Sequence, residues 1–218
     1  MENLDQSKLL DPLDNLIAGY ANYYARYFQG ESELHQKLAE GQSPKILVIA
    51  CCDSRVDPAL ITKAKEGDLF IVRNVANIVP PYESDHARHG VSAAIEFAVC
   101  HLNVQHVIVK GHSGCGGILA LLKGIQGQDQ FISRWVSVLE PAKKKVLEKF
   151  KSEISHEVCR ACEHEGIKTS LANLRTFPFI HKKINEGKLA LHGWYFDLSD
   201  GCLLKLEEAS GKFVDIFQ

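Results

Sequence analysis

The chain has 218 residues, 45% of them hydrophobic, which is ordinary for a globular protein with a substantial core. Its 25 Lys and Arg nearly balance 27 Asp and Glu, and the net charge of -2 argues against nucleic-acid or membrane partners. No apolar run approaches the roughly 18 residues of a membrane span, and the acidic start does not resemble a secretory signal, so we expect a cytoplasmic protein. Seven cysteines in such a chain favour metal or nucleophile chemistry over a disulfide framework.

The first predicted unit is a helical arm over residues 1–40. Apolar and aromatic residues recur at helical spacing from Leu9 to Leu38, with a break near Gly30, which indicates two amphipathic helices. A turn signal follows at Gly41 to Pro44. Residues 41–218 are expected to form a single α/β domain, because no linker, repeat or low-complexity segment divides them.

Three short β-branched runs in this second unit predict strands buried on both faces, at 46–50, 69–72 and 106–110. A helix is expected over roughly 87–102, and further helices to about residue 186, interrupted near Gly124 to Gly127 and Pro178. Two last apolar runs, 189–196 and 202–206, are expected to pair as an antiparallel hairpin. The predicted fold is therefore α/β, a central mostly parallel β-sheet flanked by helices, with the N-terminal arm and C-terminal antiparallel strands.

Two polar segments begin where predicted strands end. Cys51 to Arg55 follow the first strand, and Gly111 to Gly117 follow the third. Ligands of open α/β sheets bind outside the carboxyl ends of the strands, so the two segments can converge on one point. Two thiolates and one imidazole, from Cys51, His112 and Cys115, suit zinc, and three protein ligands leave the open position of a catalytic site.

Each of these residues has a plainer interpretation when taken alone. A single buried cysteine is more often a small apolar core residue, and a lone histidine is more often part of a hydrogen-bonded scaffold. A glycine pair such as Gly116 and Gly117 also occurs in tight turns and phosphate-binding loops. The prediction of a metal site therefore depends on the combination.

Three motifs together resemble those of the β-class carbonic anhydrases: Cys51-x-Asp53-Ser54-Arg55, Arg73-Asn74-Val75-Ala76-Asn77 and His112-x-x-Cys115-Gly116-Gly117. The resemblance extends from segment 41–45, which is similar to the plant-type branch, to segment 191–196, so it covers nearly the whole chain beyond residue 40. It implies one zinc ion per chain, with Cys51, His112 and Cys115 as ligands and Asp53 and Arg55 as a catalytic pair beside the metal. The substrate pocket that it implies contains Gln42, Phe70, Val75, Phe97 and Gly116, where Phe97 replaces a tyrosine of the plant-type pattern.

The activity implied by this resemblance is the reversible hydration of carbon dioxide to bicarbonate and a proton by zinc-bound hydroxide. Asp53, held by Arg55, would orient the hydroxide. One branch of the family instead closes its zinc site with the aspartate and has a tryptophan three residues before the first cysteine. This chain has Val48 there, which favours the open form.

Two other functions remain as alternatives. A carbon disulfide or carbonyl sulfide hydrolase would share the same ligands, and a catalytically inactive zinc-binding scaffold protein would retain them, although Asp53 and Arg55 argue against it. Because the family builds dimers and larger assemblies, we expect a homodimer or homotetramer whose substrate is a small molecule, with no nucleic acid or membrane partner.

Several histidines and cysteines lie outside these motifs. His86 or His89 could relay the released proton, although an exposed histidine pair is the more ordinary interpretation. His156, Cys159, Cys162 and His164 have the spacing of a second metal or redox site, but their segment reads as a helix whose cysteines face the core, so we expect no second site.

Overall fold

The computed structural model describes residues 11–29, 33–85, 87–125, 130–151 and 153–217. The chain divides into two compact units, Met1–Gln42 and Ser43–Gln218, and each is described by itself. The predicted domain boundary after residue 40 lies two residues before this division and stays a prediction. No helix of the described residues has the length and apolar character needed to cross a membrane.

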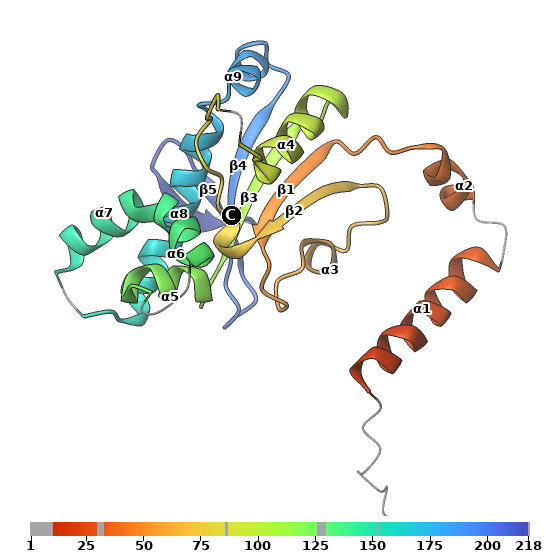
Figure 1. The fold of residues 1–218 in the computed structure, drawn as a ribbon, viewed down its shortest axis with the longest axis horizontal. Coiled ribbons are helices and arrows are strands. Elements are labelled where there is room, and N and C mark those ends of the chain that lie inside the picture. The colour runs from red at the N-terminus through yellow and green to blue at the C-terminus, as the bar shows by residue number, and fades with distance from the viewer. Residues whose placement is uncertain (1–10, 30–32, 86, 126–129, 152, 218) are drawn as a thin grey trace, which may run out of the picture. The chain divides into compact units, whose positions relative to one another are not determined.

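The N-terminal unit contains two helices, α1 (Pro12–Phe28) and α2 (Glu33–Glu40) (Figure 1). The Asp11 carboxylate accepts a hydrogen bond from the Leu13 amide at 2.8 Å and caps α1, whose first residue is a proline. The tilted rings of Tyr27 and His35 lie against each other across the two helices, with centroids 4.8 Å apart. Leu9 and Gly30, which marked the start and the break of the predicted arm, lie outside the described residues.

The second unit is built on one six-stranded sheet in the order β2-β1-β3-β4-β5-β6. Its strands are β1 (Ile46–Cys51), β2 (Leu69–Asn74), β3 (His106–His112), β4 (Ala190–Phe196), β5 (Leu203–Glu207) and β6 (Lys212–Asp215). The first four pair in parallel, and β4-β5 and β5-β6 are antiparallel, which confirms the predicted mixed α/β sheet. The sequence missed β6, and it did not anticipate that β4 also pairs in parallel with β3.

Helices flank the sheet (Figure 1). They are α3 (Pro58–Thr62), α4 (Gly90–Glu96), α5 (Gly116–Lys123), α6 (Gln130–Val136), α7 (Glu140–Phe150), α8 (His156–Leu174) and α9 (Pro178–Asn185). The helix predicted over roughly 87–102 begins at Gly90, because the backbone of His89 is not helical, and its last turn, Phe97–His101, is a π-helical turn. The sequence also missed α3, which has only five residues.

Two apolar clusters hold the helices to the sheet. One joins Leu47, Ile49 and Val109 of the strands to residues of α8 and α9. The other lies under α5, α7 and α8 and includes Cys51 and Cys115. The strand residues between those of the first cluster, such as Val48 and Ile108, form a smaller third cluster. Strands β1 and β3 are therefore buried on both faces, as their β-branched sequences predicted. The same prediction was wrong for β2, whose residues are half-buried or exposed because it lies at the edge of the sheet.

Candidate metal centre

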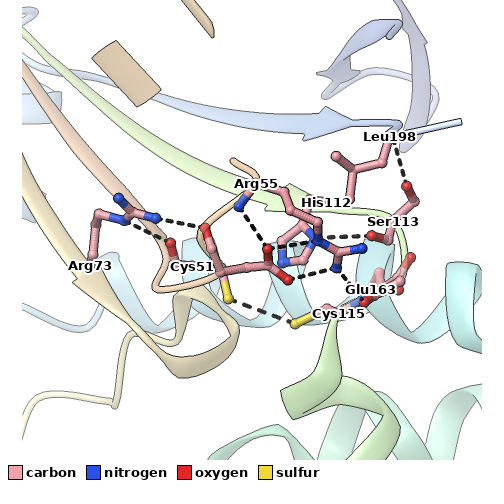
Figure 2. A network of polar contacts seen from close by, with 10 residues as sticks. Cys51, Arg55, Arg73, His112, Ser113, Cys115, Glu163 and Leu198 are labelled. Carbon is pink, nitrogen blue, oxygen red and sulfur yellow. Dashed lines mark hydrogen bonds and ion pairs between the residues drawn. The ribbon is translucent and has the colours of Figure 1, made fainter. Parts of the chain in front are cut away.

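The three predicted metal ligands meet at the carboxyl ends of two neighbouring strands. Cys51 ends β1, His112 ends β3, and Cys115 caps α5 three residues later. The Cys51 and Cys115 sulfurs are 4.0 Å apart, and the candidate ligand atoms of all three residues lie within 4.8 Å of one another (Figure 2). All three side chains are buried, so the folded chain brings together what the sequence separated by more than sixty positions.

The backbone carbonyl of the next residue, Ser113, orients the His112 ring for metal binding. The His112 Nδ1 atom lies 2.9 Å from the Ser113 carbonyl oxygen, which accepts its proton and leaves a lone pair on Nε2. That Nε2 atom is buried and has no hydrogen-bond partner among the described residues. An orphaned buried nitrogen is costly unless a metal ion takes its lone pair. The separation of the sulfurs also fits tetrahedral zinc, since two bonds of about 2.3 Å place them about 3.8 Å apart.

The two thiols affect each other's ionisation. A hydrogen bond from the Cys115 thiol lowers the pKa of Cys51 well below that of a free thiol, against the opposing effect of burial. The same contact and the burial of Cys115 raise the pKa of Cys115. The pair therefore holds one thiolate readily, and a bound cation would stabilise the second.

Asp53 and Arg55 form a bidentate ion pair at this edge of the sheet. The Arg55 Nε atom lies 2.9 Å from Oδ1 and the terminal nitrogen 2.7 Å from Oδ2, and the Arg55 amide donates to Oδ1 at 3.0 Å. These hydrogen bonds hold the pKa of Asp53 far below its usual range, so the carboxylate stays ionised. Arg55 also reaches the Gly114 carbonyl oxygen at 3.4 Å, which links the pair to the loop of His112 and Cys115.

Arg73, which the sequence placed in a motif without a role, fastens the Cys51 loop to β2. Its guanidinium donates to the Cys51 carbonyl at 3.0 Å (Figure 2) and to the Asp53 carbonyl at 2.7 Å. It also donates to the Asp57 carboxylate at 2.7 Å. Asp57 in turn caps α3 through the Ala59 amide. One arginine therefore fixes both ends of the loop that carries Asp53.

The rest of that motif forms a tight turn against α5. Ala76 and Asn77 have left-handed backbones, with φ of 64° and 47°, and the Asn74 side chain spans them by bonding both backbone groups of Ile78. A Cβ atom on Gly117 would lie 2.7 Å from Val75 and 3.0 Å from the Ala76 Cβ. Glycine at this position is thus required by the close approach of α5 to the turn.

The structure places the predicted substrate residues in different parts of the chain. Val75 packs in the cluster of Cys51 and Cys115, and Gly116 is exposed directly beside Cys115. Phe70 pairs with Leu47, four residues before Cys51, or about 13 Å along the strand. Phe97 is 45% exposed and its ring lies tilted beside that of Phe70, with centroids 5.9 Å apart. One chain therefore does not bring Phe70 and Phe97 to the metal ligands, and Gln42 belongs to the N-terminal unit.

The other described residues considered as metal ligands or proton relays lie outside this buried centre. Glu83, Asp85 and His89 also lie close enough to share a cation, but they are on the surface, and His89 bonds Asp85 at 2.6 Å, which raises the pKa of His89. His86, the other proposed proton relay, lies outside the described residues. The second cysteine motif lies in α8, where Cys162 is fully buried, and its four residues do not form a metal-binding group.

Comparison with known proteins identifies the family. The family model described as carbonic anhydrase matches residues 46–203. A relative in Arabidopsis thaliana, beta carbonic anhydrase 3, is 37% identical over 206 residues, which cover 92% of this chain and 79% of the relative. The chain belongs to the β-carbonic anhydrase family.

Solved β-carbonic anhydrases share the fold. The structure of the β-carbonic anhydrase CcaA superimposes with a TM-score of 0.87 at 36% identity, covering 93% of this chain and 91% of the other. A β-carbonic anhydrase of the filamentous ascomycete Sordaria macrospora, described as tetrameric, gives a TM-score of 0.73 at 31% identity, covering 93% and 95%. Both similarities extend over nearly the whole of each chain.

Proposed function

We propose that this chain is a carbonate dehydratase, a zinc lyase that hydrates carbon dioxide reversibly to bicarbonate and a proton. One zinc ion per chain would be held by Cys51, His112 and Cys115. The observation that carries the proposal is their buried cluster, in which two close sulfurs and the His112 Nε2 atom, which has no hydrogen-bond partner in the described part of the chain, match the donor set of a catalytic zinc site.

The chemistry divides between the ion and the chain. When bound in such a site, zinc lowers the pKa of a water molecule to about 7 and so supplies a nucleophile at neutral pH. Asp53 is ionised and can only accept hydrogen bonds, so it holds the attacking water by its proton and turns a lone pair towards the substrate. Arg55 keeps the carboxylate in that orientation through its two parallel hydrogen bonds.

Zinc content and stopped-flow hydration of carbon dioxide test the proposal directly. We expect one zinc per wild-type chain and rapid hydration. Asp53→Ala should retain zinc but lose about 100-fold in kcat/KM, since it removes the acceptor that orients the water. The matched control is Asp68→Asn, an exposed carboxylate in a surface turn, which should behave as wild type. A wild-type rate no better than buffer would favour the scaffold alternative.

The substrate itself is tested by comparing three linear molecules. The same ligands would serve a hydrolase of carbon disulfide or carbonyl sulfide. The ion pair of Asp53 and Arg55 supports a catalytic protein but does not separate these substrates. Assays with carbon dioxide, carbon disulfide and carbonyl sulfide on one zinc-loaded preparation should give hydration of carbon dioxide as the fastest reaction.

We further propose that the chain assembles as a homodimer or homotetramer. The separation of Phe70 and Phe97 from the metal ligands of their own chain supports this, because a second copy could supply them to a shared pocket. Within its own unit α1 buries none of its residues, although it carries Leu16, Ile17 and Tyr20. Light scattering of the purified protein would give the number of subunits. The cytoplasmic location expected from the sequence stays a prediction, which cell fractionation would test.

A further inference from the structure

A buried carboxylate beside the candidate metal centre has no part in the proposed reaction. Glu163 lies in α8 and is only 4% exposed. Its Oε1 atom accepts a hydrogen bond from the Cys115 amide at 3.0 Å, and its Oε2 atom accepts one from the Tyr195 hydroxyl at 2.8 Å. Figure 2 shows Glu163 next to Cys115, on the side of the ligand loop that faces α8.

Burial of a carboxylate is costly, so this position requires a physical reason. Among the described residues no Lys, Arg or His forms an ion pair with Glu163. Its two hydrogen bonds are what the structure offers in compensation, and one of them goes to a metal-ligand residue. The carboxylate therefore accepts a hydrogen bond from the Cys115 amide in place of hydrogen bonds from water.

The ligand loop needs such a support at Cys115. Ser113 is fastened on both sides, since its amide donates to the Phe196 carbonyl at 3.0 Å and its hydroxyl accepts from the Leu198 amide at 2.7 Å. Gly114, two residues before the start of α5, has a left-handed backbone with φ of 67°. Among the described residues, its carbonyl accepts one hydrogen bond, the long contact from the exposed Arg55. Beyond this turn, the Cys115 amide is fixed from the protein interior by Glu163.

The support is itself well anchored. Tyr195 is fully buried in β4, where it pairs with Gly111 of β3, one residue before His112. Glu163 thus connects α8 to the strand that positions His112 and to the amide that positions Cys115. The positions of both loop ligands, His112 and Cys115, therefore depend on the same part of the fold, α8 and β4.

We propose that Glu163 is a positioning residue that fixes the Cys115 sulfur for metal binding by accepting the hydrogen bond of the Cys115 amide. This inference rests on the proposed zinc site. The reach of the acceptor, not its charge, is what the role requires. Two conservative variants separate these properties, because Gln keeps the reach without the charge and Asp keeps the charge with one methylene less.

The test compares zinc affinities, measured by competition with a chromophoric chelator on zinc-free protein. Glu163→Ala and Glu163→Asp should bind zinc about 10- to 100-fold more weakly than wild type, the usual loss when a residue supporting a ligand is removed. Glu163→Gln should remain within about threefold of wild type. In the cobalt-substituted proteins, the thiolate-to-metal absorption should weaken in the Ala and Asp variants and return in the Gln variant.

Glu165→Ala is the matched control. Glu165 lies two positions after Glu163 in α8, and it pairs with Lys145 and Lys168 away from the ligand loop. It should bind zinc as wild type does. If Glu163→Ala fails to fold, the comparison of Gln with Asp still decides. Affinities of Asp and Gln that both equal wild type, or a Gln variant weaker than Asp, would overturn the inference. A wild type that binds no zinc would overturn the proposed function as well.

Discussion

At the scale of single residues, the pair of Asp53 and Arg55 differs from an ordinary ion pair on a loop. An exposed pair two positions apart contributes less than about 1 kcal/mol to stability. Here the guanidinium binds both carboxylate oxygens, the Arg55 amide adds a third hydrogen bond, and the same arginine touches the Gly114 carbonyl. The geometry orients the carboxylate at the metal centre, which a pair held only by charge would not do.

Arg55→Lys tests that orientation. Lysine keeps the charge but has one donor group instead of a planar fork, so Asp53 should lose its fixed direction. We expect kcat/KM for carbon dioxide hydration to fall about tenfold with zinc content unchanged, as measured by stopped flow and metal analysis. Arg134→Lys, on the exposed side of α6, is the control. A variant as active as wild type would show that charge alone suffices.

At the scale of elements, α8 packs closely against β3, which ends in His112, and against the neighbouring β4, at positions that carry glycine. A Cβ atom on Gly111 of β3 would lie 2.7 Å from the Ile167 Cδ1 atom, and one on Gly193 of β4 would lie 3.0 Å from Leu171. The absence of side chains at these points lets the helix, and Glu163 with it, approach β3 and β4. Packing at Gly111 thus bears on the position of His112, the next residue.

Gly111→Ala should destabilise the fold by about 1 to 3 kcal/mol, because the added methyl overpacks a core that has no room for it. Urea unfolding measures the loss. Removing the Ile167 Cδ1 atom in the double variant Gly111→Ala with Ile167→Val should restore part of it. In contrast, Gly90→Ala in α4 should be neutral, since nothing lies within 4 Å of its added methyl. Additive effects of the two core changes would contradict the predicted contact.

These elements also show how far sequence reasoning extends. The strands β1 and β3 were predictable because continuous β-branched runs bury both faces, and β2 was found from the same kind of run although its residues are only half-buried or exposed. Strand β6 was not, because its four residues, Lys212–Asp215, carry too little pattern, and its pairing with β5 is a tertiary property. The left-handed backbone of Ala76 likewise has no signal in the residue itself, since alanine does not favour that conformation.

The candidate centre divides in the same way. Its ligands were predictable, because Cys51 and His112 end recognisable strands and the Gly-rich turn marks Cys115. The support from Glu163 was not, because in sequence it is one acidic residue of a helix, and its contact with Cys115 spans 48 positions. Phe70 and Phe97 were assigned to the pocket from the family resemblance alone. Their distance from the ligands within one chain depends on strand register, which the pattern of residues did not give.

At the scale of the whole molecule, folding buries a titratable histidine between three elements. His164 of α8 lies against the rings of Tyr195 in β4 and Phe213 in β6, with centroid distances of 4.4 Å and 4.2 Å. Burial, together with the charges of Arg160 and Lys168, lowers the pKa of His164 from 6.5 to about 4. The unfolded chain therefore binds more protons than the folded chain between these values, and stability falls as the pH decreases through them.

His164→Phe should remove this acid sensitivity while keeping a ring in the same place. For the wild type, the single histidine should cost about 2 kcal/mol of unfolding free energy between pH 7 and pH 5. Urea unfolding at both pH values, with equal zinc added, should show the variant losing less by about that amount. His156→Phe, exposed at the start of α8, should lose as much as wild type. Equal losses in wild type and His164→Phe would contradict the assignment.

The bidentate ion pair of Arg55 with Asp53 also determines whether the carboxylate can accept a proton released in the reaction. A carboxylate whose pKa is held so low does not accept a proton at neutral pH, so Asp53 offers no reservoir beside the metal centre. A proton released in hydration must therefore be accepted by a group other than Asp53 or by dissolved buffer. We therefore expect turnover to depend on the buffering capacity of the solution around the protein.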